Sequence, residues 1–136
     1  MKKAALVLIF VFTTFAITAQ TPKKIYGDSG NLESIFYPDN SDDFGTGEWV
    51  YYHENGNIRK SGKTNNMTLE GEWKEYNENG VLFQIMNYSN GIAFGTAKFY
   101  HPNGQLMMIG KLKNGQPTGK WTTYDKRGTV LKTQTL

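Results

Sequence analysis

Aromatic and aliphatic residues recur along residues 47–136 in short runs, and turn-forming glycines and asparagines separate the runs. The runs are five to eight residues long, and they lack the period of about 3.6 residues that marks an amphipathic helix. This pattern is typical of β-strands joined by tight turns. It predicts strands at 48–53, 57–63, 72–76, 81–88, 96–100, 105–112, 120–124 and 129–135.

Two sets of residue pairs supply the expected turns. The first set is Asn55-Gly56, Asn79-Gly80, Asn103-Gly104 and Arg127-Gly128, and the second is Asn66-Met67, Asn90-Gly91 and Asn114-Gly115. Asn-Gly is the strongest short hairpin signal, and it predicts type I′ turns with positive φ at both central residues in the first set. Because no connection is long enough for a parallel crossover, consecutive strands are expected to pair in an antiparallel meander.

The same pattern repeats every 24 residues without a gap. Each unit reads G-x-W-x-x-Y-x-x-x-G-x-aliphatic, and Ala97 takes the place of tryptophan in one unit. The columns are Gly47, Gly71, Gly95 and Gly119; Trp49, Trp73 and Trp121; Tyr52, Tyr76, Tyr100 and Tyr124; Gly56, Gly80, Gly104 and Gly128; and Ile58, Leu82, Leu106 and Val130. A fixed period of this length indicates a repeat array.

The period divides the chain into four repeats at 47–70, 71–94, 95–118 and 119–136. Residues 20–46 contain a degenerate first copy, marked by Tyr26, Gly30 and Leu32, and an acidic insert that runs from position 39 to position 43. Deviation is expected there because terminal repeats cap an array. The expected fold is an all-β, elongated antiparallel meander of stacked hairpins.

The first 19 residues have the pattern of a secretory signal peptide. Lys2 and Lys3 precede an apolar run from Ala4 to Ala19, which is too short and too rich in threonine for a good membrane anchor. Cleavage near Ala19 would export the protein to the periplasm or the extracellular space. It would also leave 13 basic and 12 acidic residues of the original 15 and 12, a balance that gives little basis for nucleic-acid binding.

The motifs G-x-W-x-x-Y and N-G-x-x-x-G-x-W resemble the MORN repeat, and more closely the bacterial MORN variant repeat of the YwqK-type antitoxin family. The resemblance covers nearly all of the chain after the leader. It implies an extended sheet of stacked hairpins. It further implies scaffolding, protein association and, in some members, lipid contact, and it implies neither an enzyme nor a cofactor.

The sequence offers no catalytic or metal site. The chain has no cysteine, no G-x-S-x-G motif and no Walker loop. His53 and His101 are two repeats apart, about 19 Å across a sheet, whereas zinc needs ligand nitrogens within about 2.1 Å. The calcium-like spacing of Asp39, Ser41 and Asp43 is followed by Phe44 and Val50 where a calcium loop needs glycine and glutamate.

The aromatic columns leave two interpretations open, cross-strand core packing or a flat platform for a ligand. Tryptophan and tyrosine three positions apart fall on opposite faces of a regular strand. We therefore expect a curved sheet that shelters one aromatic face and leaves a groove on the other. The candidate binding residues are Trp49, Trp73, Trp121, Tyr52, Tyr76, Tyr100 and Tyr124.

Charge is divided between the two halves of the chain. Residues 28–78 hold 11 acidic and 4 basic residues, and residues 79–136 hold 1 acidic and 7 basic residues. A solvated surface of mixed sign and an oriented association both fit this division. The function predicted from the sequence is an exported, non-catalytic interaction or scaffold module with a protein partner and weak head-to-tail self-association. The alternatives are an envelope binder of glycan or lipid headgroups and an antitoxin-like neutraliser of a toxin.

Overall fold

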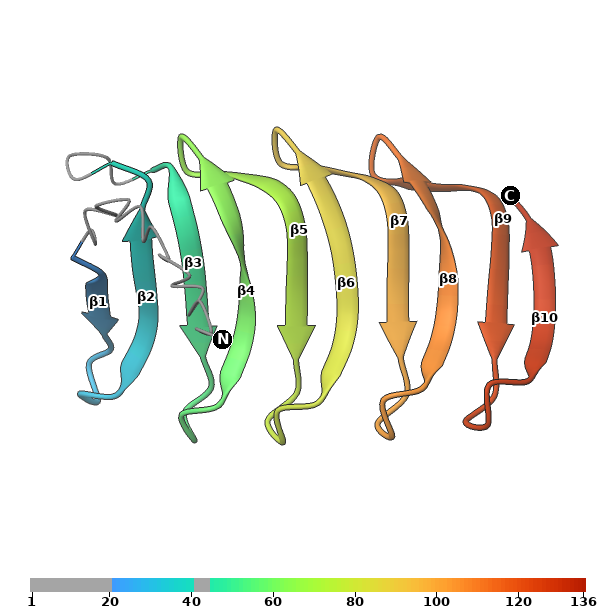
Figure 1. The fold of residues 1–136 in the computed structure, drawn as a ribbon, viewed down its shortest axis with the longest axis horizontal. Helices are drawn as coiled ribbons and strands as arrows, with labels where there is room; N and C mark the ends of the chain where they lie inside the picture. Colours follow the sequence, from blue (N-terminus) through green and yellow to red (C-terminus); the bar gives the residue numbers. More distant parts are fainter. Residues whose placement is uncertain (1–20, 41–44) are drawn as a thin grey trace, which may run out of the picture.

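The computed structural model describes residues 21–40 and 45–136, so the predicted signal peptide and residues 41–44 of the acidic insert lie outside it. All its regular elements are strands, which lie side by side along the longest axis (Figure 1). The strands are β1 (Lys23–Tyr26), β2 (Leu32–Pro38), β3 (Gly47–Tyr52), β4 (Ile58–Asn65), β5 (Thr68–Tyr76), β6 (Leu82–Ser89), β7 (Ile92–Tyr100), β8 (Leu106–Lys113), β9 (Gln116–Tyr124) and β10 (Val130–Thr135).

The ten strands form one sheet in the order of the sequence, β1 to β10, and every neighbouring pair is antiparallel. Short turns force this order, because a strand that follows a tight turn can pair only beside the strand it leaves. The prediction of an all-β meander of hairpins is confirmed. The described residues contain no helix that could cross a membrane.

Three strands begin earlier than the sequence pattern predicted. β5, β7 and β9 start at Thr68, Ile92 and Gln116, four residues before the predicted positions. Gly71, Gly95 and Gly119 therefore lie inside strands, where their φ angles of 69°, 69° and 65° mark a β-bulge. The prediction treated these glycines as breaks before each strand, and it therefore made the strands too short. In the structure each glycine forms a bulge inside a continuous strand.

The turns at the lower edge of the sheet in Figure 1 join β1 to β2, β3 to β4, β5 to β6, β7 to β8 and β9 to β10. We call them the lower turns, and their conformation differs from the prediction. Only the glycine has positive φ, for example 83° at Gly56 and 77° at Gly80. The Gly56 amide donates to the His53 carbonyl at 2.9 Å, and the His53 amide donates to the Asn57 carbonyl at 2.8 Å. This is a type I turn followed by a glycine bulge, so the prediction of type I′ turns in this set was wrong.

The upper turns, which join β4 to β5, β6 to β7 and β8 to β9, have positive φ at both central residues. The angles are 47° and 60° at Asn66 and Met67, 48° and 78° at Asn90 and Gly91, and 51° and 75° at Asn114 and Gly115. They are type I′ turns. Two of these turns also bond to the start of an earlier strand, because the Gly91 amide donates to the Leu69 carbonyl of β5 and the Gly115 amide donates to the Ala93 carbonyl of β7, each at 2.9 Å.

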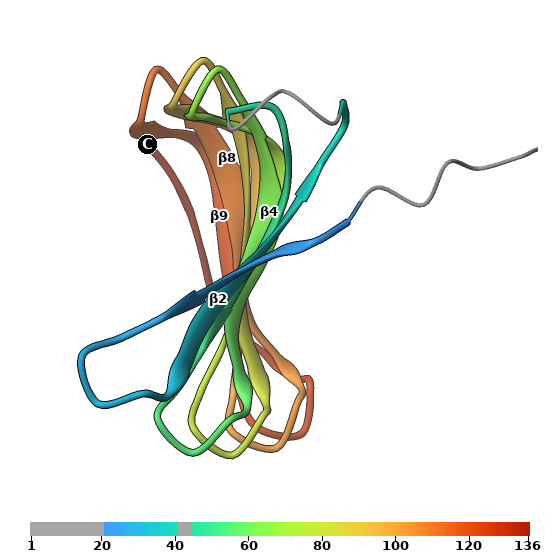
Figure 2. The same cartoon turned by 90° about the vertical axis from the view of Figure 1, so that its left-hand side faces the viewer.

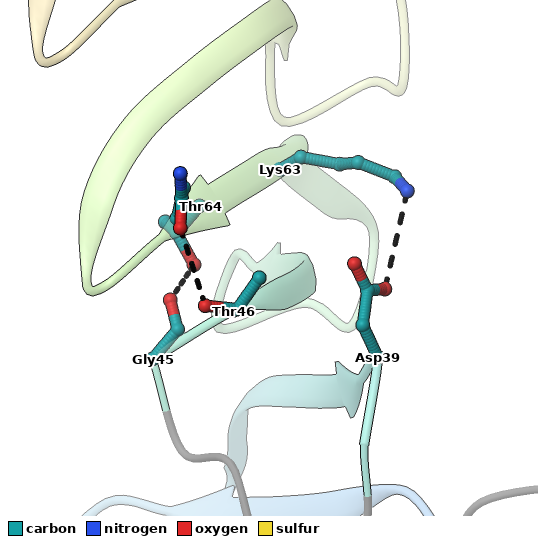
Figure 3. Close-up of polar contacts among 6 residues, drawn as sticks. Asp39, Gly45, Thr46, Lys63 and Thr64 are labelled. Carbon is teal, nitrogen blue, oxygen red and sulfur yellow. Dashed lines mark hydrogen bonds and ion pairs between the residues drawn. The ribbon is translucent and has the colours of Figure 1, made fainter.

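The segment after β2 is held against β4 on both sides of residues 41–44 (Figure 3). The Thr64 hydroxyl donates to the Gly45 carbonyl at 2.8 Å, and the Asn66 amide donates to the Thr46 hydroxyl at 3.1 Å. On the other side, Asp39 faces Lys63 at 4.0 Å. Asp39 thus has a lysine partner, and Ser41 and Asp43 of the rejected calcium pattern lie outside the described residues.

The sheet is strongly twisted. Viewed along its long axis, the hairpin of β1 and β2 crosses the direction of the later strands (Figure 2). Right-handed strand twist accumulates across ten strands in this way.

Candidate binding surface

One face of the sheet carries the tryptophan column, and we call it the tryptophan face. The register places Phe36 opposite Trp49 and Trp121 opposite Gln134 on neighbouring strands. The buried side chains of this face are Phe36 (0% exposed), Trp49 (8%), Trp73 (4%), Ala97 (0%), Leu112 (9%) and Trp121 (7%). They form two clusters, one with Phe36, Trp49 and Trp73 and the other with Ala97, Leu112 and Trp121.

Each buried tryptophan in β5 and β9 lies on a glycine of the preceding strand. A Cβ atom added at Gly62 would run into the Trp73 ring, and one added at Gly110 would run into the Trp121 ring. The sizes are reversed between these two strand pairs. Met86 takes the position equivalent to Gly62 and Gly110, and Ala97 takes the position equivalent to Trp73 and Trp121. Met86 packs against the Ala97 cluster. The interruption of the tryptophan column is therefore matched by a larger neighbour.

The N-terminal cluster continues into a half-exposed row of rings and cations. Trp49 and Tyr51 stack with ring centroids 5.5 Å apart, and the Tyr51 and Trp73 centroids are 6.4 Å apart. The Lys60 Nζ lies 4.6 Å from the Tyr51 centroid, a cation–π distance. Burial raises the pKa of the Tyr51 hydroxyl, and the nearby Arg59 charge opposes that shift.

The three indole nitrogens differ in their partners. Trp49 Nε1 donates to the Thr64 hydroxyl at 3.1 Å, and Trp73 Nε1 donates to the Lys63 carbonyl at 2.9 Å. Trp121 Nε1 is buried and has no hydrogen-bond partner among the described residues. The C-terminal cluster thus contains a buried indole N–H without a hydrogen bond to any described residue, whereas both indole N–H groups of the N-terminal cluster are hydrogen-bonded.

The tyrosine column follows the tryptophan column by three positions, so strand alternation directs it to the opposite face. We call this side the tyrosine face. Its members are all half-buried: Tyr52, Tyr76, Tyr100 and Tyr124. The seven candidate aromatic residues therefore occupy both faces, and the rings of Trp49, Trp73 and Trp121 are covered by their neighbours as core packing requires.

Two hollows open on the sheet. The first has a volume of about 430 Å³ and is mainly apolar, and it lies on the tryptophan face, not on the opposite face where a groove was expected. Its lining residues are Met86, Ala93, Phe99, Met108, Leu112, Gly115, Pro117, Trp121, Gln134 and Leu136.

The second hollow, of about 740 Å³, is polar and lies at the lower ends of the β1–β2 and β3–β4 hairpins. Glu33, Glu54, Glu78 and Arg59 contribute charge to it, and Tyr51 contributes a ring. The mixture suits a hydroxyl-rich ligand better than an apolar one.

The two histidines link successive repeats. His53 Nε2 lies 2.8 Å from the Tyr76 carbonyl, and His101 Nε2 lies 2.9 Å from the Tyr124 carbonyl. Since a carbonyl only accepts, Nε2 carries the hydrogen in both rings. In the described ranges 21–40 and 45–136 no group of acidic, cysteine or histidine side chains is arranged to hold a metal ion.

The equivalent position in the other two repeats is occupied by Asn77 and Asp125, which bond within their own turns. The Asp125 carboxylate accepts from the amides of Arg127 and Thr129, each at 2.8 Å. The amide of Thr129, followed by that of Arg127, lowers the pKa of Asp125. Along the array, turns whose histidine bonds to the next repeat thus alternate with turns whose Asn77 or Asp125 side chain bonds within the same turn.

Sequence reasoning missed the residues two positions after each tryptophan-column residue. Tyr51 and Phe99 belong to this set, and both pack on the tryptophan face. The sequence contained the signal that would have found them, since residues i and i+2 of a strand share a face. The methionines Met86 and Met108 carried no signal of their own, because their place in the hollow depends on pairing across strands.

These features define the class of protein, which is an array of antiparallel hairpins that builds its core on one face of a single sheet. The sequence profile described as MORN repeat variant matches residues 46–66, 69–90 and 95–114, which overlap the first three predicted repeats at 47–70, 71–94 and 95–118. The chain belongs to this family. A comparison of the chain with curated proteins found no match. MORN repeats are commonly protein- or membrane-interaction modules and are generally non-enzymatic.

Proposed function

We propose that this chain is an exported, non-catalytic repeat protein whose tryptophan face binds another protein. The observation that carries the proposal is the apolar hollow of about 430 Å³ on that face. Apolar pockets of this size commonly bind the anchor side chains of a partner.

The lining of the hollow supports a protein ligand. Met86 and Met108 are flexible and polarisable, and methionine-rich surfaces adapt to partner side chains. Phe99 and Trp121 supply the aromatic area that is enriched at interface centres. The general role of MORN repeats as interaction modules agrees with this use.

Site-specific photocrosslinking tests the proposal. A photoreactive amino acid at Met108, in the hollow, is expected to yield a discrete adduct with an envelope protein in the producing cell. The matched control is Ile109, the next residue of β8, which pairs with Lys98 and Thr122 on the tyrosine face. Adducts of equal yield from both positions, or from neither, would contradict binding at the hollow.

A second candidate function is glycan binding, and the polar hollow favours it. Tyr51 could stack on a sugar ring while Glu33, Glu54 and Arg59 bond to hydroxyl groups. A glycan array probed with the mature protein and with Tyr51→Ala separates the two functions. Binding that requires Tyr51, together with absent Met108 adducts, would favour the glycan ligand. Liposomes with anionic headgroups test the related lipid alternative, which would use the basic half of the chain.

Antitoxin-like neutralisation stays a third alternative, supported by the resemblance to the YwqK-type family alone. It requires a toxin as the crosslinked partner at Met108. A toxin identified in that adduct would replace the scaffold function with this one.

Export is the remaining part of the proposal, and it rests on the leader at residues 1–19. N-terminal sequencing of protein purified from the producing cell is expected to begin at or next to Gln20. A mature protein that begins at Met1, or that resists extraction by carbonate from the membrane fraction, would contradict export by cleavage.

A further inference from the structure

The outer edge of β10 is a strand edge without a partner in the described chain. β10 pairs with β9 on one side, and the sheet order places no described strand on the other. All six residues of β10 are exposed. Val130, Leu131 and Leu136 are 55%, 66% and 58% exposed, so this edge presents apolar side chains together with backbone groups.

Hydrogen bonds to β9 fix which backbone groups of β10 point outward. Leu136 and Gly119 exchange both amide-to-carbonyl bonds, each at 3.0 Å. In an antiparallel ladder, alternate residues direct their amide and carbonyl to opposite sides. The amides and carbonyls of Thr133 and Thr135 therefore face away from β9 and can pair with another strand.

The equivalent edge elsewhere in the array shows what fits there. Lys60 of β4 lies opposite Tyr51 of β3, just as Lys132 of β10 lies opposite Thr123 of β9. On its outer side Lys60 lies opposite Glu75 of β5. A strand added to β10 in the same register would thus place one residue opposite Lys132, and a carboxylate there would complement the lysine.

The packing of tryptophan adds a second requirement. Gly62 lies opposite Trp49 on one side and receives the Trp73 ring from the next strand. Gln134 holds the corresponding place in β10, opposite Trp121, and it borders the apolar hollow together with Leu136. Because a Cβ at Gly62 would run into the Trp73 ring, a strand added beside Gln134 needs a small residue there, as Ala97 lies beside Met86.

We propose that the β10 edge binds an extended acidic segment of a partner protein, which adds to the sheet as an antiparallel strand with a small residue over Gln134 and a carboxylate opposite Lys132. This inference rests on the proposed function as a protein-binding module. Strand addition obtains affinity from main-chain hydrogen bonds and specificity from alternate side chains, and β10 offers both.

Charge favours a foreign segment over a second copy of this chain. Lys132 lies in the edge strand and Lys120 lies opposite Thr135, whereas Asp125 is the single acidic residue after position 78. A second β10 would bring another Lys132. The opposite edge strand, β1, carries Lys23 and Lys24 and is also basic.

A synthetic peptide with the sequence of residues 67–77 and the change Trp73→Ala is the probe, because it has the β5 sequence with a small residue and Glu75 at the required spacing. Fluorescence anisotropy with the full-length mature protein is expected to show saturable binding. Lys132→Glu is expected to weaken binding by at least about fivefold, and a peptide with Glu75→Lys is expected to restore it on that variant. Lys126→Glu changes the net charge equally and is expected to leave binding within about twofold.

The Thr135→Pro variant tests the backbone contribution. It removes an outward amide and no bond to β9, so binding is expected to fall while the circular dichroism spectrum and melting temperature are kept. Equal losses in Lys126→Glu and Lys132→Glu, absence of any binding, or unchanged binding in Thr135→Pro would each overturn the proposal. Self-association in sedimentation that Thr135→Pro abolishes would assign the edge to a second copy and overturn the proposal too. Failure here together with specific Met108 adducts leaves the proposed function standing.

Discussion

Complementary sizes at the residue scale explain how the tryptophan column tolerates an interruption. Trp73 and Trp121 each lie on a glycine, whereas Ala97 is fully buried beside the bulkier Met86. The two columns conserve volume between them, which is the kind of exchange that a packed core accepts at low cost.

This complementarity predicts coupling between positions 86 and 97. Ala97→Trp alone should lower the free energy of unfolding by about 1–3 kcal/mol through overpacking, and Met86→Gly alone should lower it by about 2–5 kcal/mol through lost burial. The double variant restores the arrangement of Gly62 and Trp73. We expect its loss to be smaller than the sum of the single losses by at least about 1 kcal/mol in urea unfolding. Additive losses would contradict the size exchange.

Met67 is the one upper-turn residue that lacks glycine where its counterparts have it. Its φ is 60° and its side chain is 73% exposed, so it bears the steric cost of the left-handed region and gains little burial. Met67→Gly should therefore raise the free energy of unfolding by about 0.5–1 kcal/mol. The reverse change at an equivalent site, Gly115→Ala, should lower it by about 1 kcal/mol. Thermal unfolding measures both, and a destabilised Met67→Gly would contradict strain at this turn.

At the scale of the element, the lower turns depend on one glycine each. Gly80 and Gly104 have φ of 77° and 82°, and a Cβ at either would meet no atom within 4 Å. The cost of substitution is thus one of backbone conformation and not of space.

Gly80→Val and Gly104→Val should each lower the free energy of unfolding by more than about 1 kcal/mol, because a β-branched residue resists positive φ. Gly104→Asn is the matched control and should cost less than Gly104→Val, since asparagine tolerates the left-handed region. Denaturant unfolding gives the ranking. Equal stability of the valine variants and the parent would contradict the turn assignment.

Strand existence and pairing could be predicted from the sequence because turn residues and aromatic columns both report on local backbone geometry. Turn type could not, since Asn-Gly occurs at Asn55-Gly56 in a type I turn with a bulge and at Asn90-Gly91 in a type I′ turn. The number of residues between the paired ends of the strands decides between them. The hollow at Met108 was also out of reach, because it arises from side chains of five strands that meet only after pairing.

At the scale of the whole molecule, side chains of the lower turns join two pairs of successive repeats. His53 and Asn55 bond to the backbone of the following repeat at 2.8 and 2.7 Å, and His101 and Asn103 do the same at 2.9 Å each. The buried members of the two core clusters divide between β5 and β7, and Met86 and Ala93 of the second repeat pack against the C-terminal cluster. Stability in such an array is a sum of repeat and neighbour terms, so the junction of β6 and β7 is the place where the two halves of the array meet.

The division of charge between these halves predicts weak association at low salt. The acidic half of one molecule should attract the basic half of another, and this attraction should be screened as the Debye length falls from roughly 20 Å at about 20 mM salt to roughly 4 Å at about 500 mM. Sedimentation of the mature protein near 100 μM is expected to show self-association at the lower salt and a monomer at the higher one.

The edge of β1 sets a limit on this association, because the exposed Lys24 lies at the acidic end and opposes the lysines of β10. Lys24→Glu removes that like charge and should strengthen self-association at about 20 mM salt, with no effect at about 500 mM. Lys98→Glu is the control for net charge, since Lys98 lies within β7 and away from both edges, and it should weaken association. A parent protein that is monomeric at both salts, with no change in Lys24→Glu, would contradict head-to-tail contact.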